Sequence, residues 1–368
     1  MVVQTAIIGL PKSGKTTVFN ALTGARAKTG AYSVTTEANV AVVQVPDPRL
    51  GELAKIFKPK KVVHAVVEYV DAGGVVKGGA KSEGISGQLL NQISKADALL
   101  EVVRVFEDES LPHPEGSVNP ARDVATMDLE LAFSDLSIIE RRLERLKESV
   151  HKVKPQEREA GEREFELLTR IKGELEKEIP LRAQQLSEDE KLAIRAFQFL
   201  SEKPLLIVLN LGENQMERAA EIQAEVSRGY DVPNTAFTTL CGQVEAEVAE
   251  LPPEEKEQFL EAMGIEEPGI NRVIDNTYQL LDYVSFLTVG SDEVRAWTVR
   301  RSTPAQKAAG VIHSDLERGF IRAEVVKYDD LMSVGGSMAE ARKRGLLRLE
   351  GKTYPVQDGD IMHILFNV

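Results

Sequence analysis

The sequence predicts an α/β protein in which a helical hairpin interrupts the first domain and a smaller α+β domain follows. Short apolar segments typical of buried strands recur between polar loops in the first third of the chain and again at 205–209. From Met127 the apolar residues are spaced by threes and fours instead, which is the period of an amphipathic helix. Beyond about Asp282, strand-like segments return between glycine-containing turns. A chain of 368 residues is also too long for one ordinary core, so we expect two or three domains.

The chain begins with a strand, a loop and a helix in immediate succession. Residues 2–8 are apolar enough for a buried strand, residues 9–16 read GLPKSGKT, and a helix opens at Lys15. The loop fits G-x-x-x-x-G-K-[ST], in which backbone N–H groups and the helix N-terminus face phosphate groups. In this pattern the glycines let the backbone approach, Lys15 reaches the β- and γ-phosphates, and the Thr16 hydroxyl ligates Mg²⁺. We therefore expect a nucleotide site formed by Gly9, Pro11, Lys12, Ser13, Gly14, Lys15, Thr16 and Thr17.

The loop at 24–39 is expected to close over the nucleotide. It is rich in Gly, Thr and Ala without a period, and a strand is predicted after it at 40–45. It contains Thr35 and Thr36, and a threonine at this position can close over Mg²⁺ and the γ-phosphate. A threonine in an isolated loop usually only caps a turn, but the distance from the phosphate loop favours the metal role.

A second such loop follows the apolar segment 62–70, which we predict to be one strand. It begins with Asp71, which can hold Mg²⁺ through water, and Gly74 can donate its N–H to the γ-phosphate. Val75 occupies the place where many phosphate-binding switch enzymes carry the glutamine that orients the attacking water. A valine side chain cannot make that hydrogen bond.

The next strand is predicted at 98–106, followed by a polar loop at 107–120 that contains His113. A histidine in such a loop is most often only a solvated side chain. Two amphipathic helices then flank a break around Pro155 and should pair as an antiparallel hairpin, whose dense charges are most simply its solvated faces. Their apolar residues are Leu129, Phe133, Leu136, Ile139, Leu143, Leu146 and Val150 in the first, and Phe165, Leu168, Ile171, Leu175 and Ile179 in the second.

The strand at 205–209 ends in Asn210, Leu211, Gly212 and Glu213. A guanine-binding enzyme carries N-K-x-D here, with the lysine stem lying over the base and the aspartate accepting from its N–H groups. Leu211 replaces the lysine and Glu213 the aspartate, so guanine discrimination should be weakened. A further strand at 235–240 leads to Cys241 and Gly242, where such folds pass backbone amides by the base.

Composition and charge exclude several classes of protein. No run of apolar residues is long enough to span a membrane and no cleavable leader is evident, so we expect a cytoplasmic protein without a membrane partner. Cys241 is the one cysteine, which excludes an intrachain disulfide and a Cys-rich metal site. The formal net charge of −13 argues against a DNA partner, and any contact with RNA must be local. The basic cluster at 342–344 is most simply a solvated surface.

The order of these motifs resembles the YchF family, the Obg-like ATPases, over nearly the whole chain. The stretches that carry the resemblance are GLPKSGKTTVFNALT, VPDPRL at 45–50, VDAGGVVKGGAKSEGISGQ at 70–88, N-x-x-E at 210–213, VEAEVAEL at 244–251, and three C-terminal segments that end in LEGKTYPVQDGDIMHILFNV. The resemblance implies a Ras-like P-loop NTPase domain at 1–122 and 200–281, an inserted helical coiled-coil domain at 123–199, and a C-terminal β-grasp (TGS) domain at 282–368. It further implies a slow hydrolase that uses Mg²⁺, prefers ATP to GTP and associates with the ribosome or ribosomal RNA. We expect a monomer.

The resemblance also assigns roles near the γ-phosphate. His113 falls on the histidine that is proposed to assist hydrolysis in the family, Val75 matches its hydrophobic residue, and Thr35 maps best as the Mg²⁺ threonine, with Thr36 the alternative. Lys12 departs from the pattern, because the family usually has asparagine there. In related hydrolases without the glutamine, that asparagine helps to hold a potassium ion. The Lys12 ammonium could act as an internal cation instead, or it could point to solvent with the potassium effect lost.

Three functions are consistent with these residues. In the first, an ATP hydrolase binds phosphates through residues 9–17 and selects the base through Asn210 and Glu213, with Lys12, Lys15 and His113 acting in catalysis. In the second, a nucleotide-gated binding protein turns over negligibly and uses ATP to set its domain arrangement. The third is a GTPase that acts in translation, if Glu213 still reads guanine.

Overall fold

The computed structural model describes residues 3–24, 39–71, 87–149, 155–265 and 267–367. It divides into two compact units. The larger unit is Gln4–Ala41 with Glu68–Val273, and the smaller unit is Met1–Val3, Val42–Val67 and Ile274–Val368. Thr35, Thr36, Gly74 and Val75 lie outside the described residues, so their expected roles stay predictions.

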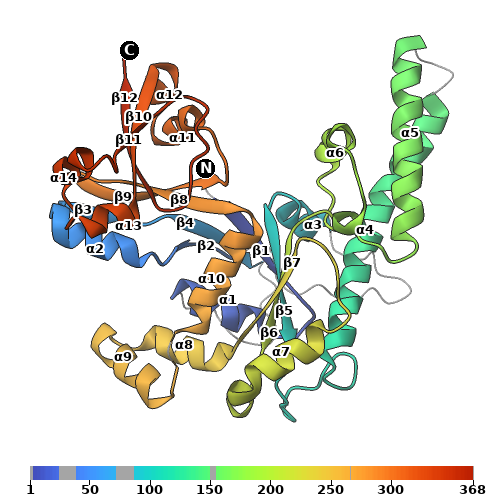
Figure 1. Cartoon of the computed structure of the whole chain (residues 1–368). Helices are drawn as coiled ribbons and strands as arrows, with labels where there is room; N and C mark the ends of the chain where they lie inside the picture. Colours follow the sequence, from blue (N-terminus) through green and yellow to red (C-terminus); the bar gives the residue numbers. More distant parts are fainter. Residues whose placement is uncertain (1–2, 25–38, 72–86, 150–154, 266, 368) are drawn as a thin grey trace. The chain divides into compact units, whose positions relative to one another are not determined.

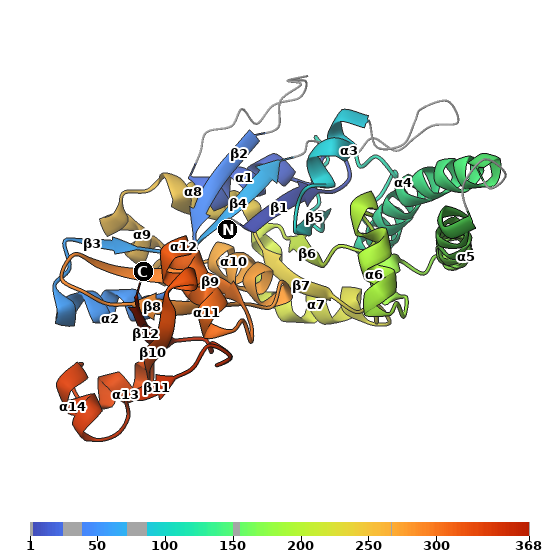
Figure 2. The same ribbon diagram turned by 90° about the horizontal axis from the view of Figure 1, so that it is seen from above.

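The first sheet is built from apolar strands in the order β2-β4-β1-β5-β6-β7 (Figures 1 and 2). Its strands are β1 (Val3–Ile8), β2 (Asn39–Gln44), β4 (Val66–Asp71), β5 (Ala98–Arg104), β6 (Leu205–Asn210) and β7 (Thr235–Leu240). β1 pairs with β5, β5 with β6, and β6 with β7, all in parallel. The carboxyl ends of β1, β5, β6 and β7 therefore meet at one edge, where ligands bind in such sheets.

Helices connect these strands, as the sequence predicts for an α/β fold. They are α1 (Lys15–Thr23), α3 (Gly87–Ile93), α4 (Pro120–Ser149), α5 (Pro155–Leu175), α6 (Glu188–Ile194), α7 (Ala219–Ser227), α8 (Gly242–Glu250), α9 (Pro253–Ala262) and α10 (Gly269–Leu280), with short 3-10 turns η1 (Leu181–Ala183), η2 (Arg195–Phe197) and η3 (Glu213–Arg218). Both helices of the expected hairpin are present, and α5 begins at Pro155, where the sequence predicted the break.

Helix α4 belongs to two hydrophobic cores. Its first half buries Val124, Met127 and Leu131 in the core that covers β5 and β6. Its second half buries Ile139 and Leu143 against α5, and the two helices run side by side in Figures 1 and 2. At 30 residues, α4 is one continuous helix from the sheet into the hairpin.

The second sheet belongs to the smaller unit and has the strand order β11-β10-β12-β8-β9-β3. Its elements are α2 (Pro48–Phe57), β3 (Lys61–Val63), β8 (Tyr283–Thr288), β9 (Glu293–Arg300), α11 (Ala305–Ile312), α12 (Ser314–Arg318), β10 (Phe320–Lys327), α13 (Tyr328–Ser333), α14 (Met338–Lys343), β11 (Arg348–Glu350) and β12 (Asp360–Phe366). The expected C-terminal α+β region is therefore present. In the expected basic cluster, Arg342 and Arg344 form ion pairs with Glu324 and Glu340, as a solvated surface does.

The predicted strand at 62–70 is wrong as a single element. It breaks at His64 and Ala65. There the Val45 N–H donates to the Ala65 carbonyl at 2.8 Å, and the Val45 carbonyl lies 3.2 Å from His64 Nδ1. The first piece, β3, pairs in parallel with β9, so this early segment lies in the sheet of the smaller unit.

Helix α2 precedes β3 and was not predicted. Asp47 caps its N-terminus, and the Arg49 guanidinium binds both Asp47 and Asp358, each at 2.8 Å. The family stretches VPDPRL and VQDGD thus meet in one ion-pair cluster within the smaller unit.

Candidate functional site

The phosphate loop has the backbone that its glycines predict. Gly9 and Gly14 have φ of 144° and 93°, values that L-residues rarely adopt. A Cβ at Gly9 would lie 2.5 Å from the carbonyl oxygen of Val102, and one at Gly14 would collide with the Asn210 amide. Both positions therefore exclude larger residues for reasons of conformation and of space.

Lys15 opens α1 and is turned back onto the loop. Its side-chain ammonium donates to the carbonyl oxygens of Gly9, at 3.0 Å, and Leu10, at 2.7 Å. The residue is 6% exposed. Burial lowers the pKa of the Lys15 ammonium to about 8, although the nearby Asp71 carboxylate acts in the opposite direction. A phosphate group entering the loop would meet a buried cation that is hydrogen-bonded to two backbone carbonyl oxygens.

The two described residues expected to hold Mg²⁺ lie together. Thr16 in α1 donates its hydroxyl hydrogen to Asp71 Oδ2 at 3.3 Å, and Asp71 is buried at the carboxyl end of β4. A hydroxyl and a carboxylate are the oxygen ligands that Mg²⁺ prefers, so these residues fit the ion. Among the described residues, no group of three or more His, Cys, Asp or Glu side chains could hold a metal by itself. Bound phosphate oxygens would have to complete the coordination.

Asn210 connects the phosphate loop to the start of α8. Its amide nitrogen donates to the Ser13 carbonyl at 3.0 Å, and its amide oxygen accepts from the Gly242 N–H at 2.9 Å. The phosphate loop and the start of α8 are therefore tied together through one buried side chain. The sequence motif assigned Asn210 to the base and missed these two contacts. The Gly242 N–H donates to Asn210, and the expected roles of both residues at the base stay predictions.

The other residues expected near the base differ in exposure. Leu211 is 3% exposed and packs in the core of the first sheet, whereas Glu213 is exposed at the start of η3. Cys241 is buried against Val244 and Val248, and burial raises the pKa of its thiol. The Cys241 side chain thus packs in a core, and the expected place of its backbone beside the base stays a prediction. Glu213 is exposed, and its expected role in reading the base stays a prediction.

Lys12 has a defined partner at the surface. Its backbone is left-handed, with φ of 66°, and its ammonium donates to the Pro112 carbonyl at 3.2 Å. Pro112 belongs to the loop between β5 and α4, directly before His113. Of the other loop residues, Pro11 and Thr17 are partly exposed, and Ser13 is buried with no hydrogen bond to its hydroxyl within the described residues.

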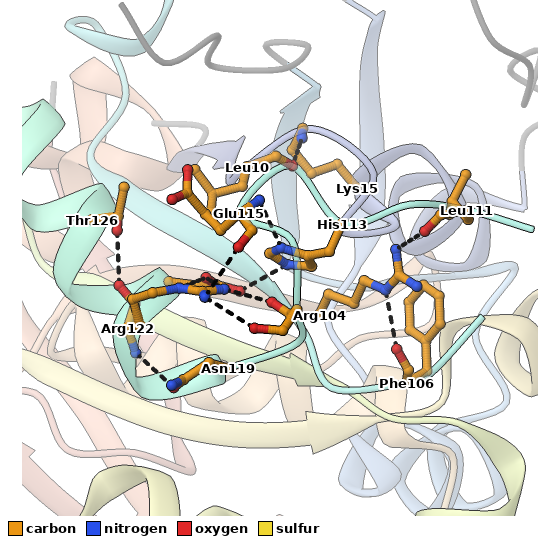
Figure 3. A network of polar contacts seen from close by, with 12 residues as sticks. Leu10, Lys15, Arg104, Phe106, Leu111, His113, Glu115, Asn119, Arg122 and Thr126 are labelled. Atoms are coloured by element: carbon orange, nitrogen blue, oxygen red, sulfur yellow. Dashed lines mark hydrogen bonds and ion pairs between the residues drawn. The ribbon is translucent and has the colours of Figure 1, made fainter. Parts of the chain in front are cut away.

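His113 is not the solvated side chain that the sequence suggested. Its side chain is 4% exposed, and Nε2 lies 3.0 Å from Asp123 Oδ2. Its Nδ1 accepts from the Glu115 N–H at 3.1 Å (Figure 3). Asp123 Oδ2 has no hydrogen bond of standard geometry among the described residues, so the His113 contact is close but poorly aligned. Both ring nitrogens face protein groups.

Sequence reasoning missed Arg104, which shapes the same loop. This buried residue at the end of β5 donates to the carbonyl oxygens of Phe106, at 3.0 Å, and Leu111, at 2.7 Å (Figure 3). It also donates to the carbonyl oxygen of Asp108 at 3.2 Å. Its guanidinium also lies 4.5 Å from the centre of the Phe106 ring. The signal was an arginine inside the apolar stretch ALLEVVRVF, since a charge at such a place needs several partners.

Comparisons with known proteins agree on one family. Residues 283–367 match the family model YchF-GTPase_C, described as a protein of unknown function, and residues 4–138 match the model described as 50S ribosome-binding GTPase. The chain is 41% identical to the ribosome-binding ATPase YchF of Bacillus subtilis over 100% of both chains, and 43% identical to that of Haemophilus ducreyi over 98% of both. The solved YchF GTPase of Schizosaccharomyces pombe is similar with a TM-score of 0.83 and 29% identity, over 99% of this chain and 97% of that one. Among the described residues, no helix has the length and apolar character needed to cross a membrane.

Proposed function

The chain belongs to the YchF family, and from this premise we propose that it is a slow ATP hydrolase that acts as a nucleotide-dependent switch on the ribosome. The observation that carries the proposal is the group formed by Lys15, Thr16 and Asp71 at the carboxyl edge of the parallel sheet. A buried ammonium beside a hydroxyl and a carboxylate suits a phosphate chain with its Mg²⁺. Relatives at 41–43% identity carry the name ribosome-binding ATPase, which supports the substrate and the partner.

We assign the metal to Thr16 and Asp71, with Thr35 as the third protein group. Bound Mg²⁺ would neutralise charge on the β- and γ-phosphates. Lys15 would exchange its bonds to Gly9 and Leu10 for phosphate oxygens, and Gly74 would donate its N–H to the γ-phosphate. The chain's own contribution is to hold the phosphate chain by backbone amides and one buried cation.

The preference for ATP rests on the residues after β6. Guanine recognition needs an aspartate and a lysine stem, and Leu211 instead contributes its side chain to the core. Glu213 is exposed but longer than aspartate, so its carboxylate would be misplaced for the paired guanine N–H groups. GTP is the alternative, because the family model over residues 4–138 and the fission-yeast relative both carry the word GTPase.

Side-by-side measurements of ATP and GTP decide between these substrates. Binding would be measured by calorimetry and hydrolysis by single turnover, with the full chain and Mg²⁺. Tighter binding and faster hydrolysis of ATP support the proposal, whereas a preference for GTP overturns the assignment of Glu213. Tight ATP binding without measurable turnover would favour a nucleotide-gated binding protein.

Lys12 is proposed to supply the charge that a potassium ion provides in related enzymes. Lys12 lies on the phosphate loop, and its ammonium is held by the Pro112 carbonyl. This partner is uncharged, so the contact does not neutralise the ammonium. Lys12→Asn suits the left-handed backbone, because asparagine tolerates that conformation. We expect the variant to hydrolyse ATP about tenfold more slowly in sodium and to recover in potassium. If the native protein and Lys12→Asn hydrolyse ATP at the same rate in sodium and in potassium, Lys12 has no catalytic role.

The remaining assignments follow the family. We propose the P-loop NTPase domain at 1–122 and 200–281, the helical domain at 123–199 and the TGS domain at 282–368, in a cytoplasmic monomer that contacts ribosomal RNA locally. The structure adds that α2 and β3, inside the first of these ranges, pair with the C-terminal sheet. Sedimentation with purified ribosomes, with and without ATP, tests the partner.

A further inference from the structure

Both ring nitrogens of His113 contact protein groups. Because Nδ1 accepts from the Glu115 N–H, its lone pair is used and the ring proton lies on Nε2, which faces Asp123 at 3.0 Å. With a side chain that is 4% exposed, neither nitrogen can take a proton from a water molecule at the nucleotide. In this arrangement the histidine is held away from the reaction.

Asp123 keeps a second partner when the His113 side chain moves away. The residue lies in the first turn of α4, and its Oδ1 accepts from Arg122 Nε at 3.1 Å and Nη2 at 2.8 Å. This ion pair compensates the buried carboxylate independently of the histidine. The contact from His113 reaches the other oxygen, Oδ2, without standard hydrogen-bond geometry. Losing the histidine therefore does not leave an unpaired buried charge.

The backbone beside His113 is already held at the phosphate loop. Lys12 binds the Pro112 carbonyl and Arg104 binds the Leu111 carbonyl. The approach of His113 to the nucleotide thus needs a rotation of its side chain, with the backbone of the two preceding residues kept in place.

We propose that Asp123 is a positioning residue that latches His113 in an inactive orientation and thereby limits the rate of ATP hydrolysis. The inference rests on the proposed ATPase function. The latch sits on α4, whose far half forms the hairpin core with α5. Because α4 is one continuous helix, a partner that moves the hairpin moves the carboxylate that holds the histidine.

The test is Asp123→Asn in the full chain. With its one oxygen kept on Arg122, the asparagine amide presents an N–H donor to His113 Nε2–H, and two facing donors repel each other. We expect the single-turnover rate constant for ATP hydrolysis to rise about three- to tenfold, with the ATP dissociation constant unchanged within about twofold. The double variant Asp123→Asn with His113→Ala must lose the rise, since the effect acts through the histidine.

Asp128→Asn is the matched control. Asp128 is a carboxylate on the same helix that also pairs with an arginine, Arg182, and it has Tyr230 rather than His113 as its second partner. Its removal perturbs α4 without opening the latch, so no rise in turnover is expected. A rise of equal size would assign the effect to general loosening of the helix and overturn the proposal.

Nitrogen NMR of the histidine rings gives a readout that is independent of turnover. The His113 signals, assigned with His113→Ala, should report one Nε2–H tautomer in the native protein and averaging in Asp123→Asn. If Asp123→Asn hydrolyses ATP at the native rate or more slowly, the latch alone is overturned. Absence of ATP turnover in the native protein overturns the proposed function, and this inference with it.

Discussion

The phosphate loop and the loop between β5 and α4 touch through Lys12 and Pro112, but their shapes are specified differently. The phosphate loop is shaped by its own residues, because Gly9 and Gly14 supply the backbone angles and the space that it needs. The second loop is shaped by side chains from the two elements that flank it. Arg104 at the end of β5 binds three of its carbonyls, and Arg122 at the start of α4 binds the Ser117 carbonyl at 2.6 Å. The first kind of shape can be read from spacing in the sequence, and the second requires the contacts themselves.

The largest effect should come from breaking the locally encoded loop with Gly14→Ala. The methyl group would collide with the Asn210 amide at a φ of 93°. We expect ATP binding to weaken by at least about a hundredfold, measured by calorimetry. Gly24→Ala is the control: Gly24 ends α1 with φ of 59° and open space around it. That variant should lose about 1 kcal/mol of stability and keep its affinity.

Breaking the second loop with Arg104→Met should act on stability first. Three hydrogen bonds from one buried cation are lost, so the free energy of unfolding should fall by about 2–4 kcal/mol in urea titrations. ATP affinity should change little, because Arg104 binds the second loop. The control is Arg295→Met, which removes a half-exposed arginine stacked on Trp297 and should cost about 0.5 kcal/mol or less. Equal losses in both variants would contradict the special role of Arg104.

The smallest effect concerns the pH dependence of Lys15. Its folded pKa of about 8 lies below the ordinary 10.5, so between these values the unfolded chain binds more protons at this group. Its contribution to stability therefore rises with pH across that window, and the cost of burying the ammonium is present in full below it. Lys15→Met should remove this slope, which the difference between urea titrations of the two proteins at several pH values would reveal. A slope that persists in the variant would assign it to other groups.

Much of the first sheet and of the phosphate site could be predicted from the sequence. The strand at β1, the helix from Lys15 and the pairing of α4 with α5 follow from periodicity, glycine placement and the motif. Thr16 and Asp71 meet as expected because the ends of neighbouring strands share one edge.

The remaining features depend on side-chain and backbone contacts between different elements, which no motif or periodicity in the sequence reveals. Asn210 was assigned to the base, yet its partners Ser13 and Gly242 come from two other segments. His113 was expected in solvent because nothing local reveals that Asp123 would cover it. The segment 62–70 was read as one strand because it is mostly apolar along its whole length. The break comes from Val45, whose N–H and carbonyl contact Ala65 and His64.

The pairing of β3 with β9 also sets the order in which this protein can be completed during its synthesis. Lys61–Val63 leaves the ribosome more than two hundred residues before Glu293–Arg300, its parallel partner. Arg49 likewise waits for Asp358, near the end of the chain described here. β1 and β5, by contrast, can pair once the first hundred or so residues have emerged. Because contacts between distant segments form late, the nascent chain carries α2 and β3 without their sheet partners until residues 293–300 and Asp358 have been made.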